Sequence, residues 1–416
     1  MKNNKVIYEL NTDEFYAYGS ATEAWSHMDY EICMDEDIDV SCLEKALSLA
    51  YERFPYFNTS LSQDSYPDRI VLVKNDTPAH VFCSENFIPI CSPELKTNLI
   101  SVANSMDCLR IRISHVLTDA VGANSFLREL LIYYCKLKYD GKSEDEIRND
   151  IIRELDEKEY DNPFNYIKLP EYQYNIKSKK SFVFSENDVD DNKRKRVSFS
   201  VDKNALLSLA KEQEASVSSV ISWIVMQMIK KNNVQDLPIS VAVPYDMRKI
   251  LNFSECKRNC NTTIVLRLNQ AFFKKSVDSQ LSALRGEMFL QMDESHCIKR
   301  MQQSYEEWEK ASECETIEDR IAFYCSDKNL DVIPVVSYIG TFDLGKYEKY
   351  YRSLDCVGNV SGGAGILSVV ICNKETFRFN VTTNLTEWGK YQESLVETLT
   401  MLELPFTEIR TDYCRE

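Results

Sequence analysis

The chain contains only four histidines, and one of them stands in a setting suited to proton transfer. A neutral imidazole accepts a proton near pH 7, because its unperturbed pKa is about 6.5. His115 follows an alternating strand-like segment, precedes small residues, and has Asp119 four positions later. Strand ends and the loops after them commonly carry reactive side chains. His115 is therefore the candidate general base, although the spacing alone slightly favours a structural histidine.

The other three histidines lack such a setting. His27 and His296 lie among polar or charged residues with no evident partner, and His80 follows Pro78 in a predicted strand or turn. We expect surface or structural roles for all three.

Alternating and helical patterns predict the elements that hold His115. Over residues 108–114 leucine and isoleucine alternate with arginine, which predicts a strand. Apolar residues at helical spacing then predict a helix over 122–139. The polar, proline-containing stretch over 140–170 is interpreted as a connection. His115 is therefore expected in a short loop between a strand and a helix.

An earlier helix is predicted from Ser41 to Phe54. Ser41 and Glu44 form a capping box, in which each side chain satisfies a free backbone donor, and Pro55 ends the helix. A strand-like run follows at 69–73.

The second half of the chain mixes strands and helices without strict alternation, so the expected fold class is α/β with mixed α+β layers. A charged stretch over 175–196, in which the apolar pattern fades, separates the two halves. We therefore divide the chain into an N-terminal lobe over 1–178 and a C-terminal lobe over 179–416. Strands are predicted at 197–201, 239–243, 263–268, 334–339, 366–372 and 377–382, and helices from residue 203 and at 216–231, 276–293 and 387–399.

Charge and hydropathy exclude several classes of partner. The formal net charge of −16 repels nucleic-acid phosphates, so no nucleic acid is expected. The basic cluster from Lys193 to Arg196 follows several acidic residues and is interpreted as a solvated linker. No run of about 18 apolar residues is present, so no membrane span is expected. The first residues also lack the apolar region of a secretory signal.

The cysteine pattern favours a reducing compartment. Fourteen cysteines are scattered along the chain, which is typical of free thiols in the cytoplasm. Cys256 and Cys260 are close in sequence, but no second pair lies near them, whereas a structural zinc site needs four ligands. We therefore predict two ordinary thiols, no metal and a cytoplasmic location. A monomer is expected as well, although no residue pattern indicates it.

A glycine-rich run at 361–365 invites comparison with a phosphate-binding loop. Such a loop directs amide donors from a helix N-terminus, but here a strand follows and no Lys-Ser or Lys-Thr pair is present. We predict a turn that joins two strands.

The segment from Ser114 to Leu127 resembles the HxxxD region of the CoA-dependent acyltransferase superfamily. That superfamily includes chloramphenicol acetyltransferase, alcohol acetyltransferases, plant BAHD acyltransferases and the condensation domains of nonribosomal peptide synthetases. Further landmarks follow in the order of the family and cover nearly the whole chain. They are the opening helix with its flanks at 34–39 and 53–57, a PxDxR-like segment at 243–249 with the later Asn259, and an SNxG-like segment at 337–340.

The resemblance implies a fold of two similar chloramphenicol acetyltransferase-like lobes around a central tunnel, with the histidine at their junction. His115 would take a proton from the hydroxyl or amine of a small-molecule acceptor and later protonate the leaving thiolate. The acyl donor would be an acyl-CoA or the phosphopantetheine thioester of an acyl carrier protein. No tightly bound cofactor is implied.

The resemblance also assigns supporting roles. Asp119 would orient the histidine loop through a structural ion pair with Arg248, the alternative being that Arg248 is a surface residue. Ser337 would donate a hydrogen bond to the oxyanion, the alternative being a strand serine without a catalytic part.

Three departures from the family pattern bear on activity. Ala120 stands where glycine is usual, ahead of the small residue Gly122, and an alanine narrows the allowed backbone conformations. Ser114 replaces the first histidine of the pair typical of condensation domains. Tyr338 replaces the asparagine of the SNxG segment, and the plant DFGWG segment is missing.

Three functions remain open. The first is an acyltransferase that moves an acyl group from a thioester donor to a small alcohol or amine. The second is a non-catalytic relative that acts as a binding or scaffold protein, which the departures at Ala120 and Tyr338 favour. The third is a condensation-like enzyme that uses carrier-bound substrates.

Overall fold

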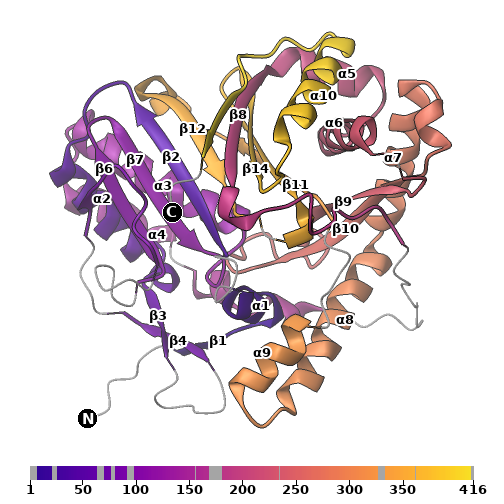
Figure 1. Cartoon of the computed structure of the whole chain (residues 1–416). Helices are drawn as coiled ribbons and strands as arrows, with labels where there is room; N and C mark the ends of the chain where they lie inside the picture. The colour runs from indigo at the N-terminus through magenta and orange to yellow at the C-terminus, as the bar shows by residue number, and fades with distance from the viewer. Residues whose placement is uncertain are drawn as a thin grey trace.

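The described part of the chain contains two large β-sheets, and helices cover one face of each (Figure 1). The computed structural model describes residues 7–20, 26–62, 70–75, 80–90, 98–154, 156–167, 180–233, 235–326, 333–360 and 362–413. Part of the predicted strand at 69–73 and of the charged stretch at 175–196 lies outside these residues.

The first sheet carries His115 at the end of one of its central strands. It has the order β12-β2-β7-β6-β5. Its strands are β2 (His27–Met34), β5 (Phe82–Cys83), β6 (Ile100–Ser105), β7 (Cys108–Ser114) and β12 (Tyr351–Val357), and its helices are α2 (Val40–Arg53), α3 (Ala120–Lys138) and α4 (Glu144–Glu154). Leu109, Ile111 and Ile113 of β7 are buried in the core beneath these helices. The alternation predicted for this strand is therefore confirmed.

The second sheet has seven strands in the order β10-β9-β11-β13-β14-β8-β15. The strands are β8 (Lys195–Asp202), β9 (Ile239–Asp246), β10 (Asn261–Leu268), β11 (Val335–Phe342), β13 (Ile366–Asn373), β14 (Thr376–Thr383) and β15 (Arg410–Tyr413). Its core is closed by α5 (Lys203–Glu212), α6 (Val217–Asn232), α7 (Val277–Gln291) and α10 (Trp388–Met401). The strands and helices predicted for this half are confirmed within a few residues at their ends.

A smaller layer joins the two lobes. It contains the sheet of β1 (Ile7–Glu9), β3 (Thr59–Ser62) and β4 (Val71–Lys74), and the helices α1 (Thr12–Ser20), α8 (Glu294–Ser312) and α9 (Ile317–Ser326). Phe15 of α1 packs on Trp308 of α8 with 4.6 Å between ring centroids. Short 3₁₀ helices occur at Pro55–Phe57, Glu157–Tyr160, Pro163–Tyr166, Asp191–Lys193, Phe272–Lys274, Gly345–Tyr350 and Gly362–Ala364.

The second half of the chain contributes one strand to the first sheet. Strand β12 comes from the second half, yet it pairs antiparallel with β2 of the first sheet, with Asp355 opposite Glu31. In Figure 1 it is the orange strand at the edge of the purple sheet. The glycine-rich run leads from β12 back to β13 of the second sheet.

Four local predictions need correction. The capping box at Ser41 is wrong, because α2 begins at Val40 and the carboxylate of Asp39 accepts from the Cys42 amide. The predicted connection over 140–170 contains α4, whose polar exposed face weakens the helical pattern. The basic cluster is only partly a linker, since Arg196 lies within β8. Helix α3 begins two residues earlier than predicted, at Ala120.

None of the helices in the described part of the chain combines the length and apolar character needed to cross a bilayer.

Candidate active site

His115 lies directly after β7, and hydrogen bonds hold both its backbone and its ring. Its amide donates to the Ser26 carbonyl at 3.0 Å, and its carbonyl accepts from Nδ2 of Asn259 at 2.6 Å. Its Nδ1 lies 3.1 Å from the carbonyl oxygen of Thr118. Because a carbonyl only accepts, Nδ1 must carry the hydrogen in the neutral ring. The unprotonated nitrogen is then Nε2, which is the atom able to take a proton.

The surroundings of His115 favour the neutral imidazole. Burial lowers its pKa below the ordinary histidine value, because a charged ring loses solvation there. The Thr118 carbonyl and the charge of Asp119 act in the opposite direction but do not compensate, and His27 adds to the lowering. A neutral ring at pH 7 has the protonation state that a general base needs.

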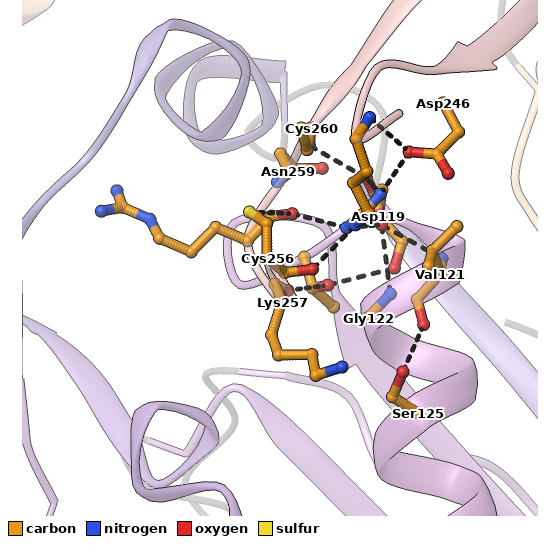
Figure 2. Close-up of polar contacts among 12 residues, drawn as sticks. Asp119, Val121, Gly122, Ser125, Asp246, Cys256, Lys257, Asn259 and Cys260 are labelled. Atoms are coloured by element: carbon orange, nitrogen blue, oxygen red, sulfur yellow. Dashed lines mark hydrogen bonds and ion pairs between the residues drawn. The ribbon is translucent and has the colours of Figure 1, made fainter. Parts of the chain in front are cut away.

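Asp119 caps helix α3 and faces an arginine from the second half of the chain (Figure 2). Its Oδ1 accepts from the amides of Val121 and Gly122, each at 3.1 Å. Both carboxylate oxygens accept from Arg248 at 2.9 Å, and Oδ2 also accepts from the Cys260 amide at 2.9 Å. Burial alone would raise the pKa of Asp119, but Arg248 and these amides lower it more strongly. The carboxylate is thus charged and satisfied without any substrate.

Arg248 is held as firmly as its partner. Its side chain is only 4% exposed, and besides Asp119 it donates to Asp246 and to the carbonyls of Cys256 and Arg258. Burial disfavours the guanidinium, yet the charge of Asp119 raises the pKa of Arg248 overall. A buried arginine with this many acceptors fixes the position of each segment that it contacts.

The segment 256–260 holds the loop of His115 at several points. Oγ1 of Thr118 donates to the Lys257 carbonyl at 2.6 Å, and Asn259 makes the bond to the His115 carbonyl described above. Cys260 makes the bond to Asp119 (Figure 2). These contacts join residues that are more than a hundred positions apart in the sequence. The orientation of the His115 loop therefore depends on the second half of the chain.

The start of helix α3 lies so close to the segment 256–260 that position 122 requires glycine. A Cβ atom at this position would lie 2.0 Å from Oγ1 of Thr118 and 2.3 Å from the Lys257 carbonyl oxygen. Ala120, in contrast, is the first residue of α3 and does not occur among the described residues with positive φ. Its methyl group therefore imposes no backbone strain, and the departure from the family glycine has a local explanation.

Two buried ion pairs, Arg258–Glu14 and Arg53–Glu159, support the segment 256–260. Nε of Arg258 donates to Glu14 of α1 at 2.8 Å, and Arg53 makes a bidentate pair with Glu159 at 2.8 Å. The Glu159 carbonyl in turn accepts from the Lys257 amide at 2.8 Å. Sequence reasoning missed these residues, because partners as far apart as positions 14 and 258 leave no local spacing to detect.

Ser337 lies on β11, opposite Val369 of β13. Val369 belongs to the core of the first lobe, so this face of β11 is directed toward that lobe. Two residues later the Ile339 carbonyl accepts from Nδ2 of Asn124 on α3 at 3.1 Å. Within the described residues no hydrogen bond joins Ser337 to His115. The structure therefore brings Asp119 and Arg248 together, whereas Ser337 lies on β11 of the second sheet.

The remaining histidines differ from one another. The prediction that His27 and His296 have no partner is wrong for both. Nε2 of His27 lies 3.5 Å from Oδ2 of Asp29, and His27 stands opposite Ser114 in the β2–β7 ladder. His80 is 60% exposed beside Glu44. His296 lies on α8, 3.7 Å from Asp293.

Comparison with known proteins relates the chain to solved structures alone. No protein-family model and no curated protein matches its sequence. The TRI101 structure of F. graminearum, complexed with coenzyme A and T-2 mycotoxin, is similar with a TM-score of 0.64 at 10% identity, covering 96% of this chain and 99% of that one. Polyketide synthase associated protein 5 from Mycobacterium tuberculosis gives a TM-score of 0.61 at 12% identity, covering 95% and 98%. The first condensation domain of the CDA synthetase gives 0.60 at 12% identity, covering 96% of each chain.

These similarities identify the fold. The chain has, over nearly its whole length, the two-lobed chloramphenicol acetyltransferase-like fold predicted from the resemblance, with mixed helices and sheets. Because the sequence identities are only 10–12%, the structural similarity establishes the architecture but not the reaction.

Proposed function

We propose that this protein is an acyltransferase that moves an acyl group from a thioester to a small alcohol or amine, with His115 as the general base. The observation that carries the proposal is the hydrogen bond between Nδ1 of His115 and the Thr118 carbonyl. It leaves Nε2 unprotonated, in a ring whose pKa is lowered by burial, within a fold shared with a protein crystallised with coenzyme A.

The reaction uses one nitrogen twice. Nε2 of His115 takes the proton of the acceptor hydroxyl or amine as that oxygen or nitrogen attacks the thioester carbonyl carbon. The tetrahedral intermediate collapses, the carbon–sulfur bond breaks, and the imidazolium returns the proton to the departing thiolate. The ring ends in its starting state, and a positioned base of this kind supplies on the order of 10²–10⁴-fold acceleration.

The supporting residues act on position and on charge. The carboxylate of Asp119 accepts two hydrogen bonds from the guanidinium of Arg248. Asp119 therefore orients the His115 loop and does not react with the substrate. Ser337 is the proposed donor to the oxyanion, since its face of β11 is directed toward the first lobe. One oxyanion donor commonly contributes about 3 kcal/mol to the transition state.

The donor is an acyl-CoA in this proposal, as the ligand of the TRI101 structure suggests. A phosphopantetheine thioester on a carrier protein presents the same reacting bond. Short acyl-pantetheine thioesters therefore belong in the donor panel beside the CoA esters.

Thiol release from this panel, in the presence of mixed alcohols and amines, tests the function. Wild type is compared with His115→Ala and with His80→Ala, a matched control that removes an exposed imidazole. Release that falls by at least about 100-fold in His115→Ala alone, with the fold intact by circular dichroism, is the expected result. Equal release by wild type and His115→Ala would show that the protein is not a His115-dependent acyltransferase and would favour a binding or scaffold role.

A further inference from the structure

Two cysteines face each other at the end of the β2–β7 ladder that lies away from His115. Cys33 of β2 stands directly opposite Cys108 of β7 in this antiparallel pair. Both are free thiols, and both are only partly buried. Strand β7 has seven residues, which corresponds to about 24 Å between Cys108 and His115. The cysteine pair therefore lies outside the proposed active site.

The hydrogen bonds of the ladder determine how close these two side chains are. The Met34 amide donates to the Asp107 carbonyl at 2.8 Å, so residues 34 and 107 form a hydrogen-bonded pair. Because hydrogen-bonded and non-hydrogen-bonded pairs alternate along an antiparallel ladder, Cys33 and Cys108 form a non-hydrogen-bonded pair. The Cα atoms of such a pair are about 4.5 Å apart, and disulfides span about 4.4–6.8 Å between Cα atoms. A disulfide here therefore requires little movement of either strand.

The two thiols interact, and their neighbours in the sheet are small. Burial, together with a hydrogen bond to the thiol of Cys33, raises the pKa of Cys108 to about 12. Ser353 of β12 stands opposite Cys33, and Ser105 of β6 stands opposite Cys108. Residues directly opposite one another project from the same face of a sheet. The pair thus lies in a row of four small, partly buried side chains, which a small reagent can reach.

An arginine lies beside the cysteine pair. Arg352 of β12 forms an ion pair with Asp107 and donates to the Met34 carbonyl, so it contacts the chain neighbour of each cysteine. Its guanidinium also interacts electrostatically with Cys33. Partial exposure and a neighbouring cation are typical of cysteines that react with disulfides.

A second pair of interacting cysteines differs in exposure. The side chains of Cys256 and Cys260 also form a hydrogen bond, but both residues are buried. Their backbone is in addition held by hydrogen bonds to Arg248 and Asp119. A reagent in solution reaches them only when the fold opens, so they provide an internal reference for the partly exposed pair.

We propose that Cys33 and Cys108 form a reversible disulfide by exchange with small disulfides, of which glutathione disulfide is the probe. One cysteine attacks the small disulfide, releases one small thiol and carries a mixed disulfide. The other cysteine attacks this mixed disulfide, releases the second small thiol and closes the Cys33–Cys108 bond. Two protein thiols are oxidised while one small disulfide is reduced, and the two protons pass to the released thiols.

The bond responds to redox conditions and fastens the first sheet. A reducing compartment keeps the pair as thiols, so the bond forms when the surroundings become oxidising. It joins the two strands whose opposite ends carry His27 and His115. It also closes a long loop from residue 33 to residue 108, which restricts the unfolded chain. The inference does not depend on the proposed acyltransferase function.

Peptide mapping tests the pair. The reduced protein is incubated with glutathione disulfide under native conditions, alkylated, and digested without reduction. We expect a peptide crosslinked through Cys33 and Cys108 that reduced glutathione removes, whereas Cys256 and Cys260 should remain uncrosslinked. The inference would be overturned if Cys33 and Cys108 stayed alkylatable after the treatment. A crosslink that reduced glutathione leaves intact would equally contradict a reversible site.

Single variants separate pairing from general thiol reactivity. Cys33→Ser and Cys108→Ser should form no crosslink and should keep a glutathione adduct on the remaining cysteine. Cys83→Ser removes an exposed cysteine of β5 and should crosslink as wild type does. Oxidation should raise the melting temperature of wild type and Cys83→Ser by roughly 5 °C, but not that of the other two variants. An equal rise in Cys33→Ser and Cys108→Ser would show that another cysteine is responsible and would contradict the proposal.

Discussion

Asn259 donates a hydrogen bond of 2.6 Å to the carbonyl oxygen of His115, 144 positions away in the sequence. The carbonyl belongs to the residue whose ring is proposed to move the proton. The second half of the chain therefore determines where the base of the first half lies. The bond also shows why the two halves of the chain cannot be assigned separate roles in the site.

Replacing Asn259 by alanine should slow the reaction more than it weakens binding. The loss of this bond releases the His115 backbone, and small displacements of a catalytic group are costly. We expect kcat to fall about tenfold with little change in KM, corresponding to roughly 1.4 kcal/mol for one hydrogen bond. Steady-state kinetics checks this, with exposed Asn165→Ala as the control. A rise in KM with unchanged kcat would contradict a positioning role.

The Asp119–Arg248 pair should show strong coupling. Asp119→Asn keeps an oxygen to cap α3, and Arg248→Met removes the guanidinium, so each leaves one buried charge without its main partner. We expect each single variant to lose about 3–5 kcal/mol of unfolding free energy, and the double variant to lose less than the sum. Urea denaturation of the four proteins measures this. Asp246→Asn, at a half-exposed partner of Arg248, should lose no more than about 1 kcal/mol. Simple additivity in the cycle would show that the pair is not coupled.

Acid should destabilise the protein through Asp119. Its pKa in the folded state lies below the ordinary value, near 3.9 in the unfolded chain. The unfolded state therefore binds the proton first. The stabilisation by this group is present above about pH 4 and is lost as the pH falls through the folded-state pKa. Unfolding free energies of wild type and Asp119→Asn at pH 6, 4 and 3 should converge as the pH falls. A constant difference would contradict the assignment.

Activity should persist into mildly acidic solution. Burial lowers the pKa of His115, so the ring stays neutral somewhat below pH 6.5. The acidic limb of kcat/KM against pH should therefore have its inflection below about 6.5, since that profile reports the free enzyme. Removing the neighbouring imidazole in His27→Gln should move the inflection upward, because His27 contributes to the lowering. An inflection above 6.5 in wild type would argue against His115 as the titrating base.

Gly122→Ala should be strongly destabilising. The added methyl group would meet Oγ1 of Thr118 and the Lys257 carbonyl at far less than contact distance, so α3 or the segment 256–260 must shift. We expect a loss of about 2–3 kcal/mol, as for overpacked sites, together with reduced activity. Gly286→Ala is the matched control, because open space surrounds this exposed residue of α7 and alanine should stabilise the helix by up to about 1 kcal/mol. Similar melting temperatures for Gly122→Ala and wild type would contradict the close approach.

The sequence by itself determined the local elements of the site. Alternation over 108–114 and helical spacing after it are properties of consecutive residues, so β7, α3 and the loop of His115 could be predicted from them. The order of short motifs along the chain indicated the two-lobed fold and named Asp119 and Arg248 as partners. Helix α4 was missed because its sequence is too polar to show a clear apolar face.

Only the tertiary structure decided how distant segments meet. It determined that β12 completes the first sheet and that Thr118 selects the tautomer of His115. It also placed His27 beside the reactive loop. A salt bridge such as Glu14–Arg258 joins residues with no periodic relation, so local spacing contains no signal for it. Such contacts arise because the buried faces of the elements dock together and bring polar groups into a shared interior, where each must find a partner.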